Sequence, residues 1–314
     1  MKKLALVFAG QGSQYAGMGI DLVDAFYELK EKEKKASEVL GFDVRQILLS
    51  TDGKINETEF TQGLVLLTSI YAYEIFKTLG VKVSAASGFS LGEYSALYAA
   101  NVFDFEHIMR IIQKRSEFMK ACALKYPGKM AAVIGLSKDQ VEKICQESSE
   151  KGVVVAANYN SPIQIVISGE EHAVIYASQK AKEAGAKRVM ELQVSGAFHS
   201  PLMKEAGEKL FDYIKHLSYQ APLFPIYMNT TAKPLIEKNL YQEMEKQIQS
   251  SVYFEQTIEQ MVQDGVTHII EIGPGTVLSG LIKKININIE VSHFGKLNDL
   301  EELKGWLNEH GFSK

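Results

Sequence analysis

The chain has 314 residues, of which 46% are hydrophobic and 23% are charged. This length and composition suit about two domains with a sizeable core, and they exclude a disordered or fibrous protein. The 34 basic and 38 acidic residues leave a net charge of -4 without a block of like charge, so we expect no nucleic-acid binding.

The first part of the chain alternates predicted strands with predicted helices. An apolar strand over 4–9 runs into a glycine-containing turn, and an amphipathic helix is expected over 21–40. A second helix is expected over 62–79, a weak strand over 81–87 and a further helix over 91–100. Strands that lead through a turn into a helix are typical of an α/β fold.

The pattern changes to six short segments between residues 128 and 194. Their order is βαββαβ, which folds into a four-stranded antiparallel sheet with two helices on one face. We therefore expect a small domain of residues 128–194, inserted in a larger α/β domain of residues 1–127 and 195–314. The six segments lie over 130–135, 138–148, 153–157, 164–168, 171–184 and 188–194.

After the insertion, helices are expected over 201–217, 253–264 and 277–283, and strands over 226–228 and 268–272. Two cysteines are too few for a disulfide framework and lack the spacing of a metal site, so we expect a cytoplasmic protein without a bound metal. The longest later apolar stretch is interrupted by Thr68 and Ser69, and we expect no membrane segment.

Ser90 is the candidate nucleophile. It lies in Gly88-Phe89-Ser90-Leu91-Gly92, which fits G-x-S-x-G at a predicted turn from strand to helix. Such a turn exposes the serine hydroxyl above the sheet, and the N-terminus of the following helix favours developing negative charge. The turn Gly10-Gln11-Gly12 offers further backbone donors from a separate loop.

Seven histidines compete for the role of the base that a serine nucleophile needs. Most fall within predicted helices, at the start of a strand or near the C-terminus, where histidines without catalytic duty are ordinary. His199 differs, because it lies in a loop between the last strand of the small domain and the next helix. Catalytic groups often converge at such junctions, although spacing alone does not decide the assignment.

Arg115 follows a helical run and, taken alone, fits a surface arginine. A substrate that carries a carboxylate would give it a function, because a guanidinium pairs bidentately with a carboxylate and remains charged when buried.

Five motifs together resemble the malonyl-CoA:acyl carrier protein transacylases, a family of acyltransferases in fatty acid and polyketide synthesis. They occur in the order of that family and span the chain from residue 8 to about residue 283. The resemblance implies a larger α/β-hydrolase-like domain with a parallel sheet and an inserted, smaller ferredoxin-like domain. The motifs are Phe8-Ala9-Gly10-Gln11-Gly12-Ser13-Gln14, Gly88-Phe89-Ser90-Leu91-Gly92-Glu93, Arg115, Gly196-Ala197-Phe198-His199-Ser200 and Glu271-Ile272-Gly273-Pro274-Gly275.

The resemblance also implies a reaction. Ser90 would take the malonyl group from malonyl-CoA and give it to the phosphopantetheine thiol of acyl carrier protein, in ping-pong covalent catalysis. His199 would be the general base of a dyad, with its other nitrogen oriented by a backbone carbonyl. Arg115 matches the clamp for the malonyl carboxylate, and Gln11 and Leu91 match the backbone donors of the oxyanion hole. Coenzyme A enters as a substrate, and no cofactor is implied.

Three positions depart from the family pattern. Phe89 stands where histidine is usual before the serine, Gln62 lies in Thr-Gln-Gly where Thr-Gln-Pro is common, and Tyr253 stands where glutamine or arginine is frequent. We therefore expect no contribution of the Tyr253 side chain to orienting the catalytic histidine. Asn160 fits the family's loop near the active site, and it also fits ordinary turn chemistry before Ser-Pro.

Other functions remain open at the level of sequence. An α/β-hydrolase would share G-x-S-x-G and use a late base such as His268 or His293, but it requires neither Arg115 nor the inserted domain. The same scaffold could serve a polyketide synthase in trans, or hydrolyse acyl groups from carrier proteins. A binding module that has lost activity is a further alternative, and the presence of all three expected catalytic-site residues argues against it.

Overall fold

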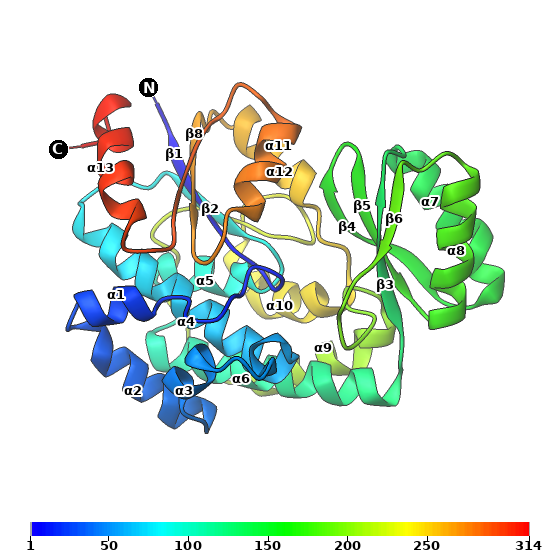
Figure 1. The fold of residues 1–314 in the computed structure, drawn as a ribbon, viewed down its shortest axis with the longest axis horizontal. Helices are drawn as coiled ribbons and strands as arrows, with labels where there is room; N and C mark the ends of the chain where they lie inside the picture. The colour runs from blue at the N-terminus through cyan, green and yellow to red at the C-terminus, as the bar shows by residue number, and fades with distance from the viewer. Residues whose placement is uncertain (1, 314) are drawn as a thin grey trace.

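The protein is described by a computed structural model that covers residues 2–313. Two sheets organise the chain, one parallel with five strands and one antiparallel with four, and they lie in separate parts of the molecule (Figure 1). The expected α/β fold with a parallel sheet is therefore confirmed. None of the helices within the described residues has the length and apolar character that crossing a bilayer requires.

In the five-stranded sheet, every pair of neighbouring strands is parallel. The central strand is paired on both sides at its carboxyl end, where Phe8 is in register with Gly88 and with Ile272. The carboxyl ends of parallel strands share one edge of the sheet, so the turns that follow them meet there. The strand order is β7 (Ile226–Tyr227), β2 (Ala85–Gly88), β1 (Leu4–Phe8), β8 (His268–Ile272) and β9 (Glu290–Phe294).

Helices cover both faces of this sheet, which explains why β1 is apolar at every position. Successive side chains of a strand point to opposite faces. Leu4, Leu6 and Phe8 belong to one core cluster, whereas Ala5 and Val7 belong to another. The helices of the first cluster include α4 (Thr58–Thr78), α5 (Gly92–Ala99) and α6 (Phe105–Lys125), and those of the second are α11 (Phe254–Gln263) and α12 (Val277–Ile285).

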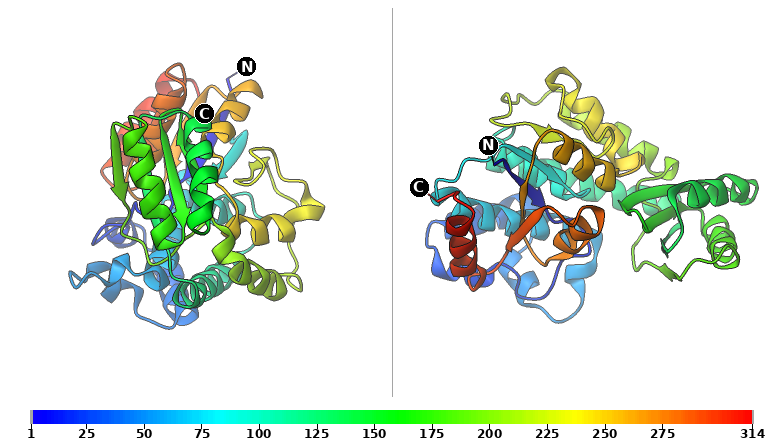
Figure 2. Two further views of the ribbon diagram at one scale, coloured as in Figure 1. Left: turned by 90° about the vertical axis from the view of Figure 1, so that its right-hand side faces the viewer. Right: turned by 90° about the horizontal axis from the view of Figure 1, so that it is seen from above.

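The antiparallel sheet is formed by the chain between residues 129 and 191, in the βαββαβ order that the sequence predicts. Its two helices lie on the face that points away from the rest of the molecule (Figure 2). A capping box between Ser137 and Gln140 starts the first of them. The strand order is β4 (Val154–Ser161), β5 (Gln164–Gly169), β3 (Lys129–Ile134) and β6 (Arg188–Glu191), and the helices are α7 (Lys138–Ser148) and α8 (Glu171–Glu183).

The single helix expected over 21–40 is wrong, because the chain forms two helices there, α1 (Ile20–Ala25) and α2 (Leu29–Leu40). Between them the backbone of Phe26 is extended, with φ of -118° and ψ of 100°. No proline or glycine marks this break, so the spacing of apolar residues predicts one continuous helix here.

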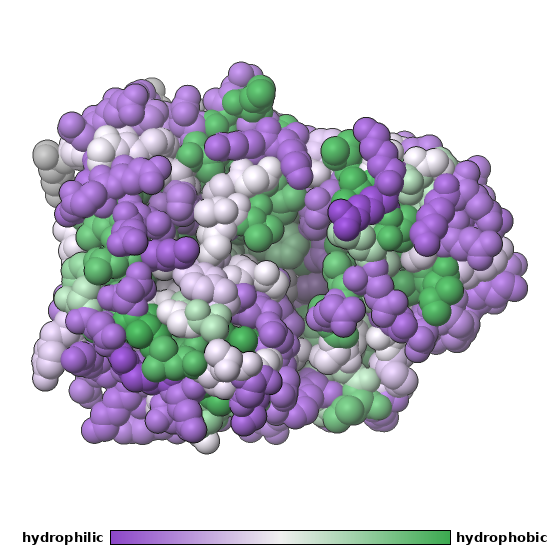
Figure 3. Space-filling view, in the orientation of Figure 1, coloured by the Kyte–Doolittle hydropathy of each residue, from purple (hydrophilic) through white to green (hydrophobic). Residues whose placement is uncertain are grey.

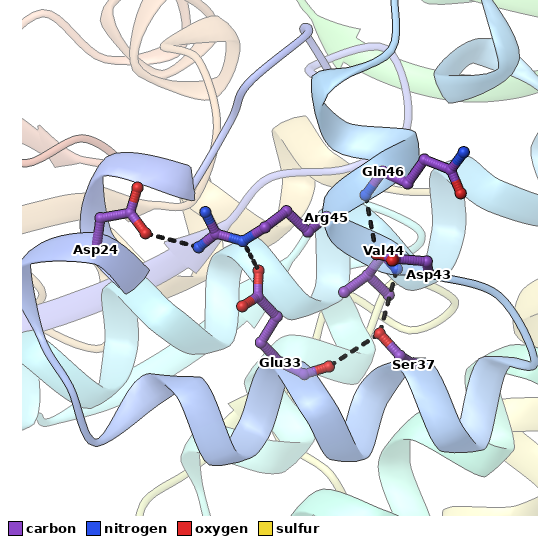
Figure 4. Close-up of polar contacts among 7 residues, drawn as sticks. All are labelled: Asp24, Glu33, Ser37, Asp43, Val44, Arg45 and Gln46. Carbon is purple, nitrogen blue, oxygen red and sulfur yellow. Dashed lines mark hydrogen bonds and ion pairs between the residues drawn. The ribbon is translucent and has the colours of Figure 1, made fainter.

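Arg45 holds the two short helices together. It lies on α3 (Val44–Leu49) and donates hydrogen bonds to Asp24 of α1 at 2.7 Å and to Glu33 of α2 at 2.9 Å (Figure 4). One guanidinium therefore links a side chain of each of these two helices.

Several other boundaries differ from the sequence expectation. The strand expected over 81–87 is limited to β2, and the helix expected over 201–217 is a short 3-10 turn followed by α9 (Lys204–Ile214). Three helices and one strand had no counterpart in the prediction: α3, α10 (Leu240–Gln249), α13 (Asp299–Glu309) and β9. Of these, α10 carries a residue of the candidate active site.

Candidate active site

Ser90 lies in the tight turn between β2 and α5, with a left-handed backbone of φ 51°. Glycine is needed on both sides of it. A Cβ at Gly88 would approach the carbonyl carbon of Gly92 to 1.9 Å, and a Cβ at Gly92 would approach the Phe8 carbonyl oxygen to 2.0 Å. The G-x-S-x-G pattern thus allows the helix to start against the end of the central strand, with the serine at the apex.

His199 contacts Ser90 directly, with 2.7 Å between Nε2 and Oγ, although 109 positions separate the two residues. Its Nδ1 lies 2.9 Å from the Gln247 carbonyl oxygen and 3.2 Å from that of Ser250. Carbonyl oxygens only accept, so Nδ1 carries the proton of the neutral ring and Nε2 accepts from the serine hydroxyl. This tautomer is the one that a general base requires.

The charge state of His199 also suits a base. Burial, together with a smaller effect of the positive charge of Arg115, lowers the pKa of His199 to about 4, although the two carbonyl contacts act in the opposite direction. The imidazole is therefore neutral at physiological pH and free to accept a proton.

Arg115 is almost completely buried, with 1% of its surface exposed, and reaches the site from α6. Its guanidinium donates to Gln62 Oε1 at 2.6 Å, to Gln247 Oε1 at 3.1 Å and to Ser90 Oγ at 3.2 Å. The expectation of a surface arginine, taken from the sequence alone, is wrong. Arg115 instead faces the same hydroxyl group as His199.

The hydrogen-bond partners of Arg115 are all neutral. Its Nε is buried and has no partner within residues 2–313, and the guanidinium lies 5.1 Å from the centroid of the Tyr94 ring. Burial lowers the pKa of Arg115, yet an arginine side chain stays protonated in proteins. The site thus holds a buried cation without a hydrogen-bonded carboxylate, which suits an anionic group on a ligand.

A cavity of about 310 Å³ opens at this point, between the parallel and the antiparallel sheet. Figure 3 shows the molecule hollowed there, with apolar residues beside the hollow. Ser90, Arg115 and His199 line it together with Gln11 and Asn160, so five of the six residues proposed from the sequence share one cavity. The side chain of the sixth, Leu91, is buried outside the lining.

The backbone N–H groups of Gln11 and Leu91 have no hydrogen-bond acceptor in the part of the chain that the structure describes. Leu91 directly follows the serine, and Gln11 lies in the turn after β1, where Gly10 packs so closely that a Cβ would lie 2.4 Å from the Phe89 carbonyl oxygen. Two free donors are therefore brought near Ser90 from separate turns.

Asn160 lies on β4 with 6% of its surface exposed, so the expected loop is a strand at this position. Its Oδ1 is buried without a hydrogen-bond partner in the described residues. Such a group is costly to leave unpaired, and a ligand in the cavity could satisfy it.

The three departures from the family pattern have distinct surroundings. The Phe89 ring lines the cavity and packs edge to face on Phe254, with ring centroids 5.5 Å apart. Gln62 is a direct partner of Arg115. The Tyr253 ring stacks on Tyr159 at 5.0 Å and is not among the hydrogen-bond partners of the histidine Nδ1.

Gln247 is the site residue that the sequence analysis missed. It is fully buried, accepts from Arg115 through its side chain, donates from Nε2 to the Ser90 carbonyl oxygen at 2.5 Å, and faces His199 with its own carbonyl. The apolar spacing of Leu240, Met244 and Ile248 would have indicated helix α10, but it would not have singled out a glutamine.

The late histidines that a hydrolase could use lie elsewhere. His268 packs against Trp306 with ring centroids 5.6 Å apart, and His293 lies 3.7 Å from Asp299. Neither lines the cavity at Ser90. Within residues 2–313, no three His, Cys, Asp or Glu side chains are grouped closely enough to hold a metal ion.

Comparisons with known proteins agree with this geometry. The family profile described as "Acyl transferase domain" matches residues 5–290. The malonyl CoA-acyl carrier protein transacylase of Staphylococcus aureus (strain MRSA252) is 40% identical over 309 residues, which cover 98% of this chain and 99% of that protein. The crystal structure of MCAT from Streptococcus pneumoniae is 40% identical, with a TM-score of 0.93 over 97% of this chain and 100% of that one.

A further similar structure contains a type II PKS acyl-carrier protein in complex with its malonyl-transacylase. It is 34% identical, with a TM-score of 0.92, and covers 96% of this chain and 98% of that chain.

Proposed function

The chain belongs to the acyl transferase family, and we propose that it is a malonyl-CoA:acyl carrier protein transacylase of fatty acid biosynthesis. The observation that carries the proposal is the contact of Ser90 with His199 beside a buried arginine whose bonded partners are all neutral. A serine and a base perform acyl transfer, and the arginine selects an acyl group that ends in a carboxylate.

In the first half-reaction, Ser90 Oγ attacks the thioester carbon of malonyl-CoA while its proton passes to His199 Nε2. The negative oxygen of the tetrahedral intermediate is held by the backbone N–H groups of Gln11 and Leu91. The bond from carbon to sulfur then breaks, and His199 gives its proton to the departing sulfur of coenzyme A. The product is malonyl-Ser90. The 2.7 Å contact and the Nδ1 tautomer support this assignment of roles.

In the second half-reaction, the phosphopantetheine thiol of acyl carrier protein attacks the acyl-serine. Its proton goes to His199, the new carbon–sulfur bond forms, and the ester bond to Oγ breaks as Ser90 regains a proton. The scheme is a ping-pong reaction that needs no cofactor and no metal, with coenzyme A and acyl carrier protein as carriers of the acyl group.

Arg115 would bind the malonyl carboxylate, with Asn160 lining the same cavity. The unpartnered Nε and the neutral acceptors at Gln62 and Gln247 support this role, because they leave the positive charge available for the substrate. Acetyl-CoA has no group to pair with this cation, so discrimination follows from the cost of burying it unpaired.

We further propose that residues 128–194 form an inserted, ferredoxin-like domain in an α/β-hydrolase-like larger domain of residues 1–127 and 195–314. The strand order β4-β5-β3-β6 and the two helices on one face support this division. The two buried, free cysteines fit a reducing cytoplasm.

Service to a polyketide synthase is the second candidate, favoured by one observation. A similar structure is a malonyl-transacylase bound to a type II PKS acyl-carrier protein. The two functions share the chemistry at Ser90 and differ in the carrier protein that receives the malonyl group.

Intact-mass analysis tests the proposal. The purified chain is mixed with malonyl-CoA, then with acetyl-CoA in a separate sample, and acyl carrier protein is added to the labelled protein. We expect a malonyl adduct that the Ser90→Ala variant does not form and that disappears as malonyl carrier protein accumulates. An adduct lost to water in place of transfer would indicate a hydrolase, and equal labelling of the Ser90→Ala variant would reject Ser90 as the nucleophile.

A further inference from the structure

Asn229 has no role in the scheme above, although it is among the most constrained polar residues near the site. It follows strand β7 by two positions and is 2% exposed. It lines neither the cavity at Ser90 nor a second cavity, which His199, Glu243 and Ser250 line with other residues. Any effect of Asn229 on the reaction must therefore be transmitted by the residues that it contacts.

The side-chain amide of Asn229 bonds to both sides of the nucleophile turn. Oδ1 accepts from the Ser90 backbone N–H at 2.7 Å, and Nδ2 donates to the Gly88 carbonyl oxygen at 2.7 Å. In a parallel sheet, one residue pairs in this way with the residues before and after its neighbour. The backbone pairing of β2 with β7 ends at Ser87 and Tyr227. Beyond this pair, the side-chain amide of Asn229 makes the hydrogen bonds that the backbone of β7 would otherwise make.

Ser90 needs such support because its backbone is strained. A residue other than glycine with φ of 51° is uncommon, and this conformation persists only where surrounding contacts enforce it. The Asn229 amide is the hydrogen-bond partner of the serine's own N–H, so it acts directly on the strained dihedral.

The backbone of Asn229 ties the turn to two further parts of the site. Its N–H donates to Glu93 Oε2 in the first turn of α5 at 2.7 Å, and its carbonyl accepts from the Tyr253 N–H at 2.9 Å. Tyr253 ends the segment whose Ser250 carbonyl faces His199 Nδ1. Asn229 thus joins the nucleophile turn to the segment that orients the base.

We infer that Asn229 is a positioning residue for acylation, and that its side-chain amide holds the strained Ser90 backbone so that Oγ stays in line with His199 Nε2. The inference rests on the proposed function of Ser90. Loss of the amide lets the turn relax, and a displacement of the order of 1 Å at a reacting atom costs about 100-fold in rate. Malonyl-CoA binding is retained, because Asn229 does not line the cavity.

Single-turnover labelling by malonyl-CoA, followed by intact mass, separates the maximal acylation rate from the half-saturating concentration. We expect Asn229→Ala to lower the maximal rate about 100-fold with an unchanged half-saturating concentration. The matched control is Ser87→Ala, which removes a buried hydrogen bond of 2.8 Å to the Tyr227 carbonyl in the same pair of strands and touches neither Ser90 nor His199. We expect this control to label at nearly the wild-type rate.

Asn229→Asp gives a second readout that a loss of stability alone would not produce. A carboxylate can accept from the Ser90 N–H but cannot donate to the Gly88 carbonyl, whereas the protonated acid can do both. Burial raises the pKa of a carboxyl group at this position, and so does the neighbouring carboxyl of Glu93, whose own pKa burial raises to about 8. The labelling rate of Asn229→Asp relative to wild type should therefore rise as the pH falls from 8 to 5.5, while the ratio for Ser87→Ala stays constant.

The outcomes separate the two claims. A wild-type chain without an adduct at Ser90 would overturn the proposed function and this inference with it. Normal wild-type labelling together with an Asn229→Ala rate within threefold of Ser87→Ala would overturn the inference alone. If Asn229→Ala does not fold, the pH dependence of Asn229→Asp decides, and a constant ratio rejects the role of the amide.

Discussion

Ser90 and His199 meet at 2.7 Å, and both have left-handed backbones, with φ of 51° and 58°. Such dihedrals are uncommon for residues with a Cβ and tend to cluster at functional sites. In His199 the strain is supported by its N–H, which donates to the Ile248 carbonyl at the end of α10. The contact between the two side chains is therefore supported by the backbone conformation at both residues.

The pH dependence of acylation tests the charge state of this pair. Because burial lowers the pKa of His199 to about 4, the base stays neutral well below the usual histidine range. We expect the acid limb of kcat/KM for malonyl-CoA to lie near pH 4, since this parameter reports the pKa values of the free enzyme. An acid limb at pH 6.5 would contradict a buried, neutral histidine.

The same shift predicts how folding stability depends on pH. The folded-state pKa of His199 lies below its unfolded value of 6.5, so the unfolded chain binds more protons between these values. The contribution of this group is present above pH 6.5 and is lost as the pH falls toward 4. Urea unfolding of wild type and of His199→Gln across this range should show a smaller pH dependence in the variant, and identical slopes would reject the shift.

Removal of the buried cation should change the preference for malonyl over acetyl groups. Arg115→Ala should lower malonyl transfer far more than acetyl transfer, by an amount on the order of 2 to 5 kcal/mol, which is typical when one partner of a buried charged pair is lost. Parallel acylation assays with malonyl-CoA and acetyl-CoA measure the difference. Arg45→Ala, which removes a partly exposed arginine that does not line the cavity, should leave the ratio unchanged. Equal losses for both substrates in Arg115→Ala would reject the carboxylate clamp.

Motifs that are local in sequence were predictable. The glycines around Ser90 and the loop that carries His199 pointed to the two groups, and the βαββαβ order of the antiparallel unit followed from short segments of strong periodicity. The burial of Arg115 was not predictable from its own neighbours, because its partners at Gln62 and Gln247 lie 53 and 132 positions away.

Contacts made by single polar residues also could not be predicted from the sequence. Gln247 and Asn229 lie 157 and 139 positions from the serine that they contact, and neither belongs to a pattern with a period. The break at Phe26 was missed because no glycine or proline marks it, and the contacts of Arg45 with α1 and α2 come from a separate helix. Tertiary partners, not propensities, determine these features.

Gln62 offers a test of why the partners of Arg115 are neutral. Its Oε1 accepts from the guanidinium at 2.6 Å, while its Nε2 has only a weak contact with the Met119 sulfur at 3.4 Å. Gln62→Glu keeps the shape and places a carboxylate on the cation, where it competes with the carboxylate of the substrate. We expect a large fall in malonyl acylation and little change in acetyl acylation.

The control for this prediction is Gln62→Leu, which removes the acceptor without adding charge and should impair malonyl acylation less than Gln62→Glu does. The assay is again acylation from the two coenzyme A thioesters. Equal effects of the two variants on malonyl transfer would show that charge compensation at Arg115 is not what matters.

The close approach of α5 to the central strand predicts a stability cost at Gly92. A Cβ there would lie 2.0 Å from the Phe8 carbonyl oxygen, and the clash is with backbone, which has few ways to move aside. Overpacking typically costs about 1 to 3 kcal/mol, and we expect Gly92→Ala to reach the upper end and to displace Ser90 as the turn opens.

Gly280→Ala is the matched control, because a Cβ at this exposed glycine in α12 would have no atom of another part of the protein within 4 Å. Alanine there should stabilise by up to about 1 kcal/mol through helix propensity. Urea unfolding measures both changes, and a Gly92→Ala variant as stable as Gly280→Ala would mean that the turn does not depend on this contact.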